Sequence, residues 1–135
     1  MNIDGKCHCG EITFRAEVNP DHVIVCHCSD CQALSGSPYR TVVPAVEGTF
    51  QIEKGNPKIY VKTIEDGVQR AQAFCPECGS PIYSAPVGEA AMQFIGIRVG
   101  LIKQKDQLKP NKQIWCRSSI GWVQDLSDVP RSETE

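Results

Sequence analysis

The chain has 135 residues, of which 41% are hydrophobic and 22% are charged, and its formal net charge is -2 at pH 7. This composition is typical of a soluble globular domain and excludes a fibrous or disordered chain. The near balance of charges, with no basic run, argues against nucleic acid or an anionic membrane surface as a partner. No segment is apolar enough to span a membrane, and the first residues lack the apolar core of a signal peptide, so we expect a cytoplasmic protein.

Short apolar segments separated by turn residues predict a succession of β-strands. The segments are Ile12–Ala16, Val23–Val25, Tyr39–Val43, Phe50–Glu53, Ile59–Thr63, Gln69–Phe74, Ile82–Ser84 and Gln93–Val99. One helical turn is expected at Ser29–Leu34, with Ser29 as its cap. Strands at this spacing predict a single all-β domain over residues 1–130, followed by a tail over residues 131–135.

The eight cysteines are the unusual feature of the composition, because seven of them fall in three tight clusters. The clearest cluster is Cys75-Pro76-Glu77-Cys78-Gly79. Two thiols separated by two residues lie on one side of a tight turn and match two corners of a tetrahedron. Pro76 stiffens the turn, and Gly79 tolerates the positive φ that the turn needs. We therefore expect half of a zinc site here.

The other two clusters, Cys7-His8-Cys9 and Cys26-His27-Cys28-Ser29-Asp30-Cys31, could supply the remaining ligands. Ligand counting assigns Cys7, Cys9, Cys75 and Cys78 to one closed, structural zinc site, and Cys26, Cys28 and Cys31 to a second zinc. Three protein ligands with one vacant position are the general form of a catalytic zinc site. A disulfide framework is the alternative, and both the missing export signal and the odd number of clustered thiols weigh against it.

Three residues could close the second site and make it purely structural. His27 and His8 each lie between two cysteines, and in an extended segment their side chains point away from those of their neighbours. Cys116 stands alone in an apolar, strand-like segment, where a small buried hydrophobe is the expected role. Beside the cluster, Asp30 and Ser35 could relay protons, although a capping or solvated role is equally compatible with their positions.

The order of these motifs resembles the glutathione-dependent formaldehyde-activating enzyme family, which includes centromere protein V. The matching pieces are Gly5–Gly10, Cys26–Cys31 with the following Ser35-Gly36-Ser37, and Phe74–Ile82, together with a C-terminal segment that contains Trp115 and Trp122. The resemblance implies small antiparallel sheets around zinc sites, a fold called a β-tent or Mss4-like fold. It also implies a structural zinc on Cys7, Cys9, Cys75 and Cys78 and a catalytic zinc on Cys26, Cys28 and Cys31. The family often has an arginine where this chain has Gln72.

The function implied by this resemblance is that of a carbon–sulfur lyase, which forms or breaks an adduct between an aldehyde and a small-molecule thiol, with glutathione and formaldehyde as the first candidates. An open zinc site fits this chemistry, because a thiol bound to zinc is deprotonated. A non-catalytic interaction module with two structural zinc sites is the alternative, and a vacant fourth position on the second zinc separates the two hypotheses. Redox sensing through Cys31 or Cys116 is a third hypothesis, which rests only on the presence of the thiols.

Overall fold

Ten strands and one α-helix make up most of the regular structure in the computed structural model of the chain, which describes residues 1–64, 66–88 and 93–135. The strands are β1 (Asn2–Lys6), β2 (Thr13–Glu17), β3 (Ile24–Cys26), β4 (Arg40–Pro44), β5 (Gln51–Lys54), β6 (Lys58–Thr63), β7 (Gln69–Phe74), β8 (Pro81–Pro86), β9 (Gly96–Arg98) and β10 (Lys112–Ile114). The helix is α1 (Ser29–Ser35), and short 3-10 helices are η1 (Pro20–His22), η3 (Val99–Leu101), η4 (Lys105–Gln107) and η5 (Cys116–Ser118).

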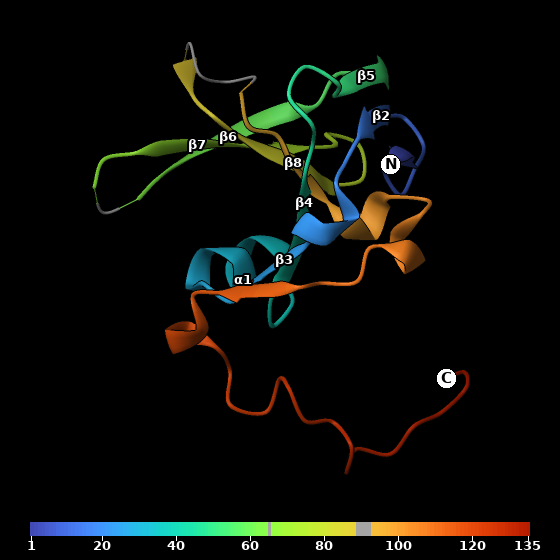
Figure 1. Cartoon of the computed structure of the whole chain (residues 1–135), viewed down its shortest axis with the longest axis vertical. Helices are drawn as coiled ribbons and strands as arrows, with labels where there is room; N and C mark the ends of the chain where they lie inside the picture. Colours follow the sequence, from blue (N-terminus) through green and yellow to red (C-terminus); the bar gives the residue numbers. More distant parts are fainter. Residues whose placement is uncertain (65, 89–92) are drawn as a thin grey trace.

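The strands form two sheets, and this confirms the predicted all-β fold of small sheets (Figure 1). A three-stranded sheet has the order β1-β2-β5, and a seven-stranded sheet has the order β10-β3-β4-β9-β8-β7-β6. Neighbouring strands are antiparallel except at one edge, where β10 pairs with β3 in parallel. In the described residues, no helix is long and apolar enough to cross a bilayer.

The core lies between the two sheets, because each sheet buries one face. In β1 and β2 every second side chain is buried, as the period of two along a strand requires. Phe14 of β2 packs on Phe50, with ring centroids 5.8 Å apart, and Phe50 packs on Tyr83 of β8 at 5.0 Å. Val43 and Ile97 of the large sheet belong to the same buried cluster. This core holds the two sheets together and leaves the opposite face of the large sheet free for polar groups.

Each of the eight predicted strand segments overlaps one observed strand, and several ends differ by a single residue. Strands β1 and β10 were not predicted, because their sequences are short and polar. The predicted helical turn is present as α1, but the expected cap was wrong. Cys28 is the N-cap residue, because its sulfur accepts a hydrogen bond from the amide of Cys31, whereas Ser29 is already the first helical residue. Gly36 ends the helix in the left-handed conformation, at φ 63°.

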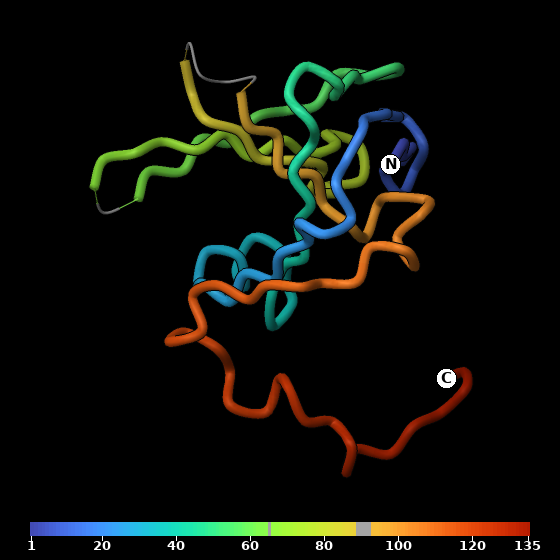
Figure 2. The backbone as a smooth tube through the Cα atoms, in the orientation of Figure 1, coloured from blue at the N-terminus to red at the C-terminus, as the bar shows by residue number. Residues whose placement is uncertain are grey.

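The last part of the chain runs away from the two sheets (Figure 2). After Ile120 it contains turns but no strand or helix, and most of its side chains are exposed. A hydrogen bond from Gln124 Nε2 to Gln113 Oε1, at 2.9 Å, joins it to β10. The single-domain boundary at residue 130 stays a prediction.

Candidate metal centres

Four cysteines from distant parts of the chain bring their sulfurs close together, and we call this group the four-thiol cluster. Its members are Cys7, Cys9, Cys75 and Cys78, and their Sγ atoms all lie within 4.8 Å of one another. The Sγ atoms of Cys7 and Cys9 are 3.6 Å apart, and those of Cys9 and Cys75 are 3.7 Å apart. A zinc–sulfur bond of about 2.3 Å gives a tetrahedron with edges of about 3.8 Å. The spacing of the sulfurs therefore fits a tetrahedral metal ion, and it is far too long for a disulfide bond.

Two tight turns hold these thiols in place. After β7, the amide of Gly79 donates to the carbonyl of Cys75 at 2.8 Å, and Gly79 has the predicted positive φ, at 75°. After β1, the amide of Gly10 donates to the carbonyl of Cys7, and the amide of Ile12 donates to the Cys7 sulfur at 3.3 Å. An amide that points at a sulfur stabilises the thiolate form. The turns therefore prepare the sulfurs as ligands before a cation binds.

The second group, which we call the three-thiol cluster, consists of Cys26, Cys28 and Cys31, whose sulfurs also lie within 4.8 Å of one another. Cys26 ends β3 and is buried, whereas Cys28 caps α1, Cys31 lies in its first turn, and both are half-buried. The helical turn brings Cys31 back toward the other two sulfurs, and the cap hydrogen bond fixes Cys28. The cluster is thus built locally, within six residues.

Because the three sulfurs lie so close together, each thiol changes the pKa of its neighbours. A hydrogen bond with Cys31 lowers the pKa of Cys26, against the effect of burial. The pKa of Cys31 is raised by the same hydrogen bond and by burial, while the positive charge of Arg40 acts in the opposite direction. One thiolate is therefore stabilised at the expense of its neighbour. A divalent cation would take the place of the shared protons and stabilise all three thiolates, as soft metal ions do.

No other cysteine, histidine or acidic side chain joins the three sulfurs in the part of the chain that the structure describes. The His27 ring is buried outside the three-thiol cluster, and its Nε2 lies 2.7 Å from Gln113 Oε1. Because that oxygen can only accept, Nε2 carries the proton. His8 is exposed and belongs to neither cluster. Asp30 forms an ion pair with Lys62 at 2.8 Å, and the Ser35 hydroxyl donates to the Cys31 carbonyl at 2.6 Å.

The expectation that Cys116 is a small buried hydrophobe was wrong, because its side chain is exposed. β10 ends at Ile114, and Trp115 adopts a left-handed conformation at φ 57°. This residue turns the chain out of the sheet, so that Cys116 begins the 3-10 helix η5 on the surface. Cys116 therefore neither fills the core nor closes the three-thiol cluster.

Two buried arginines that the sequence pattern did not predict, Arg40 and Arg98, lie near the three-thiol cluster, and we call them the arginine pair. Arg40 is 6% exposed and lies directly opposite Cys26 in the pairing of β3 with β4. Arg98 lies opposite Val42, two residues further along β4, so both arginines are on the same face as Cys26. Both guanidiniums donate to Gln72 Oε1, at 3.1 Å from Arg40 and 2.8 Å from Arg98. Burial and the neighbouring Arg40 lower the pKa of Arg98 to about 9, so it is still a cation at neutral pH.

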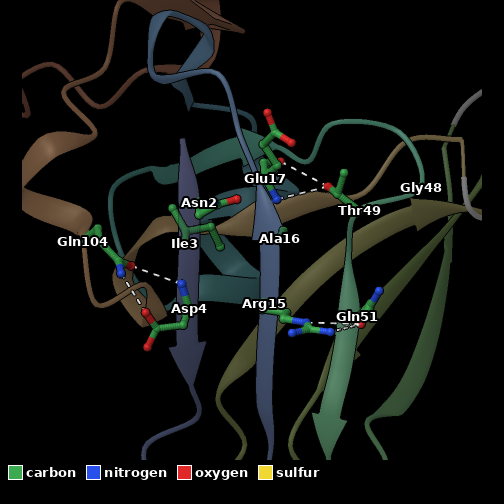
Figure 3. A pocket seen from close by; sticks show the side chains of 10 residues that line it. All are labelled: Asn2, Ile3, Asp4, Arg15, Ala16, Glu17, Gly48, Thr49, Gln51 and Gln104. Carbon is green, nitrogen blue, oxygen red and sulfur yellow. Dashed lines mark hydrogen bonds between the residues drawn. The ribbon is translucent and has the colours of Figure 1, made fainter.

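A cavity of about 400 Å³ lies over the arginine pair. Its lining includes the arginine pair, Gln72, Leu34 of α1, Tyr60 of β6 and Gly79, which follows Cys78. Another groove, of about 660 Å³, lies on the three-stranded sheet (Figure 3). There Arg15 donates to Gln51 and Gln104 donates to Asp4, and none of the described lining residues is a cysteine or histidine. The cavity of about 400 Å³ is the better candidate for chemistry, because its lining includes Arg40, which lies opposite Cys26, and Leu34 of the helix that carries Cys31.

The fold and the paired thiol clusters define the class of the protein: a small all-β protein with two cysteine sites that could hold metal ions. The profile of the glutathione-dependent formaldehyde-activating enzyme family matches residues 2–118, and the chain belongs to this family. A crystal structure of a Rhodobacter sphaeroides protein is similar, with a TM-score of 0.60 and 16% sequence identity over 82% of this chain and 98% of that chain. At this identity the likeness shows the fold alone. No curated protein matches the chain significantly.

Proposed function

We propose that the protein is a zinc-dependent enzyme that forms or breaks an adduct between a thiol and an aldehyde, a carbon–sulfur lyase of the S-hydroxymethylglutathione synthase type. The observation that carries the proposal is the three-thiol cluster, which has three ligands and no fourth among the described residues. In this proposal the four-thiol cluster holds a structural zinc, and Cys26, Cys28 and Cys31 hold a catalytic zinc. We further propose that the enzyme is cytoplasmic, where thiols stay reduced.

The reaction itself needs neither an oxidant nor a reductant. The sulfur of the thiol forms a bond to the aldehyde carbon, the carbon–oxygen double bond becomes a single bond, and the thiol proton ends on the new hydroxyl oxygen. A zinc ion with three thiolate ligands and a free position would hold the substrate sulfur as a thiolate at neutral pH. Glutathione and formaldehyde are the first substrates to test, because the family is named for them.

The residues of the chain would contribute position and environment. Cys26 fixes one ligand on the buried end of β3, while the cap of α1 fixes Cys28 relative to Cys31. The ion pair between Asp30 and Lys62 ties α1 to β6 across the same face of the large sheet. This arrangement would keep the three thiolates in a fixed geometry beside the cavity while the fourth position stays accessible to substrate.

The test is an exchange measurement at equilibrium. Magnetisation exchange between free formaldehyde and its glutathione adduct is recorded by NMR, with zinc-loaded protein and with a protein-free blank, because the uncatalysed reaction is itself appreciable. We expect faster exchange with the wild-type protein, loss of that acceleration in Cys28→Ser, and full retention in Cys116→Ser, which removes an exposed thiol outside both clusters. No acceleration with any thiol by zinc-loaded protein would contradict the proposal and favour a non-catalytic interaction module.

A further inference from the structure

The arginine pair is unusual because two cations are buried without a carboxylate partner among the residues that the structure describes. Arg40 and Arg98 are 6% and 7% exposed. Burying a charge is costly unless an opposite charge and hydrogen bonds compensate it. Among the described residues, no carboxylate lies within ion-pair distance of either guanidinium. Their shared partner is a neutral amide oxygen, that of Gln72.

The described residues use only part of the hydrogen-bonding capacity of the pair. Each guanidinium has five N–H groups in a planar fork, a shape that matches the two oxygens of a carboxylate. The Nε atoms of Arg40 and Arg98 are both buried and lack a partner in the described part of the chain. Buried donors without acceptors are rare in native proteins and indicate a missing partner.

The arginine pair lies next to the three-thiol cluster, the candidate active site, in the large sheet. Cys26, Arg40, Arg98 and Gln72 all project from one face of the large sheet, by the registers of the strands that carry them. The two arginines and Gln72 line the cavity of about 400 Å³, so a molecule that enters the cavity can reach them. A ligand with a carboxylate on the guanidiniums would extend from there toward the three-thiol cluster.

The net charge around the three-thiol cluster is compatible with an anionic ligand. Three thiolates around a divalent cation carry one net negative charge, whereas the arginine pair carries two positive charges. Before substrate binds, this face of the sheet therefore has an excess of positive charge that an anionic group can neutralise.

We propose that Arg40 and Arg98 form a carboxylate-binding subsite, oriented by Gln72, and that the enzyme acts on a substrate that carries a carboxylate near its reacting sulfur or carbonyl group. The assignment of this ligand as a substrate rests on the proposed function. The subsite itself rests only on the buried guanidiniums and the cavity. The carboxylate can belong to the thiol or to the aldehyde, and the experiment separates these two sources.

Binding is measured by calorimetry on the zinc-loaded protein, without any reaction. For the thiol, the probes are 3-mercaptopropionate and its uncharged analogue 3-mercapto-1-propanol. For the aldehyde, glyoxylate is compared with acetaldehyde. We expect the carboxylate-bearing member of at least one pair to bind about tenfold more tightly, the effect of one charge-assisted hydrogen-bonded pair. Equal affinities within both pairs overturn the inference.

The decisive variant is Gln72→Glu, which conserves side-chain volume and places a carboxylate where both guanidiniums already donate. We expect this variant to melt at or above the wild-type temperature and to lose the preference for carboxylate ligands. The matched control is Gln51→Glu, which makes the same change at the partner of the exposed Arg15 and keeps the preference. Arg98→Lys, which retains a cation but not the fork, should weaken the preference as well.

The outcomes separate the two proposals. If adduct exchange is catalysed but carboxylate and neutral ligands bind equally, the inference is overturned and the proposed function stands. If the carboxylate preference is present and is lost in Gln72→Glu, but no thiol and aldehyde exchange faster with the protein, the subsite stands and the proposed function is overturned. A preference that survives in Gln72→Glu overturns the assignment to the arginine pair.

Discussion

Replacing Cys75 by serine removes one corner of the four-thiol cluster, and the cost can be worked out from the position of that residue in the chain. Cys75 is fully buried, and its sulfur lies 3.7 Å from that of Cys9, 66 residues away. A metal ion on this cluster closes the intervening segment into a loop, as a disulfide would, and so restricts the unfolded chain. The three-thiol cluster spans only Cys26 to Cys31, so it closes a far shorter loop.

The loop-closure relation gives a stabilisation of about 4 kcal/mol for the loop between Cys9 and Cys75, and of about 2 kcal/mol for the loop between Cys26 and Cys31. With an unfolding entropy of roughly 2.1 cal/mol/K per residue, these values correspond to melting temperatures lower by about 15 °C and about 7 °C. Cys75→Ser should therefore destabilise the protein about twice as much as Cys28→Ser. The buried position of Cys75 adds to this difference, because a serine hydroxyl there loses its ligand bond and is shielded from water.

Melting curves of zinc-loaded wild-type protein, Cys75→Ser, Cys28→Ser and the control Cys116→Ser, recorded by circular dichroism, check this ranking. Cys116→Ser should have the same melting temperature as the wild type, since that thiol is exposed and outside both clusters. If Cys28→Ser melts well below Cys75→Ser, the assignment of structural and catalytic sites is reversed.

Three further predictions concern metal content and packing. Elemental analysis of protein purified under reducing conditions should give up to two zinc ions per chain, and a chelator should remove the one on the three-thiol cluster first; metal-free protein with intact disulfides would contradict this. Gly5→Ala should lower the free energy of unfolding by about 2 kcal/mol or more, because the new methyl group would collide with the Phe14 ring and lie 2.7 Å from the carbonyl of Leu101. Gly100→Ala is the control, because its methyl group would enter open space and should leave the melting temperature unchanged. Lys62→Met should lower stability by less than about 1 kcal/mol, since the carboxylate of its partner Asp30 is half exposed; a larger loss in denaturant unfolding would show that this ion pair holds α1 in place.

The sequence predicted the features that depend on near neighbours. The alternation of apolar and polar residues located eight strands, and Cys-x-x-Cys with a following glycine located a turn whose Gly79 does have a positive φ. These signals are local, because the period of a strand and the geometry of a turn involve only a few consecutive residues. The resemblance carried by the same motifs is confirmed by the family match over residues 2–118. The cap of α1 is a local feature that was predicted wrongly, because the Cys28 thiol caps the helix in place of the Ser29 hydroxyl.

Local sequence patterns were enough to predict eight strands, the two thiol clusters and the family, whereas the surroundings of the clusters depend on strands that are distant in the sequence. Arg40, Gln72 and Arg98 lie on three different strands and meet only because the register of the large sheet turns their side chains to one face. The exposure of Cys116 depends on a single left-handed residue, and the parallel edge strand β10 depends on a partner far away in the sequence. Strand register is a long-range property, because a shift of one residue moves every side chain to the opposite face, and no local pattern records it.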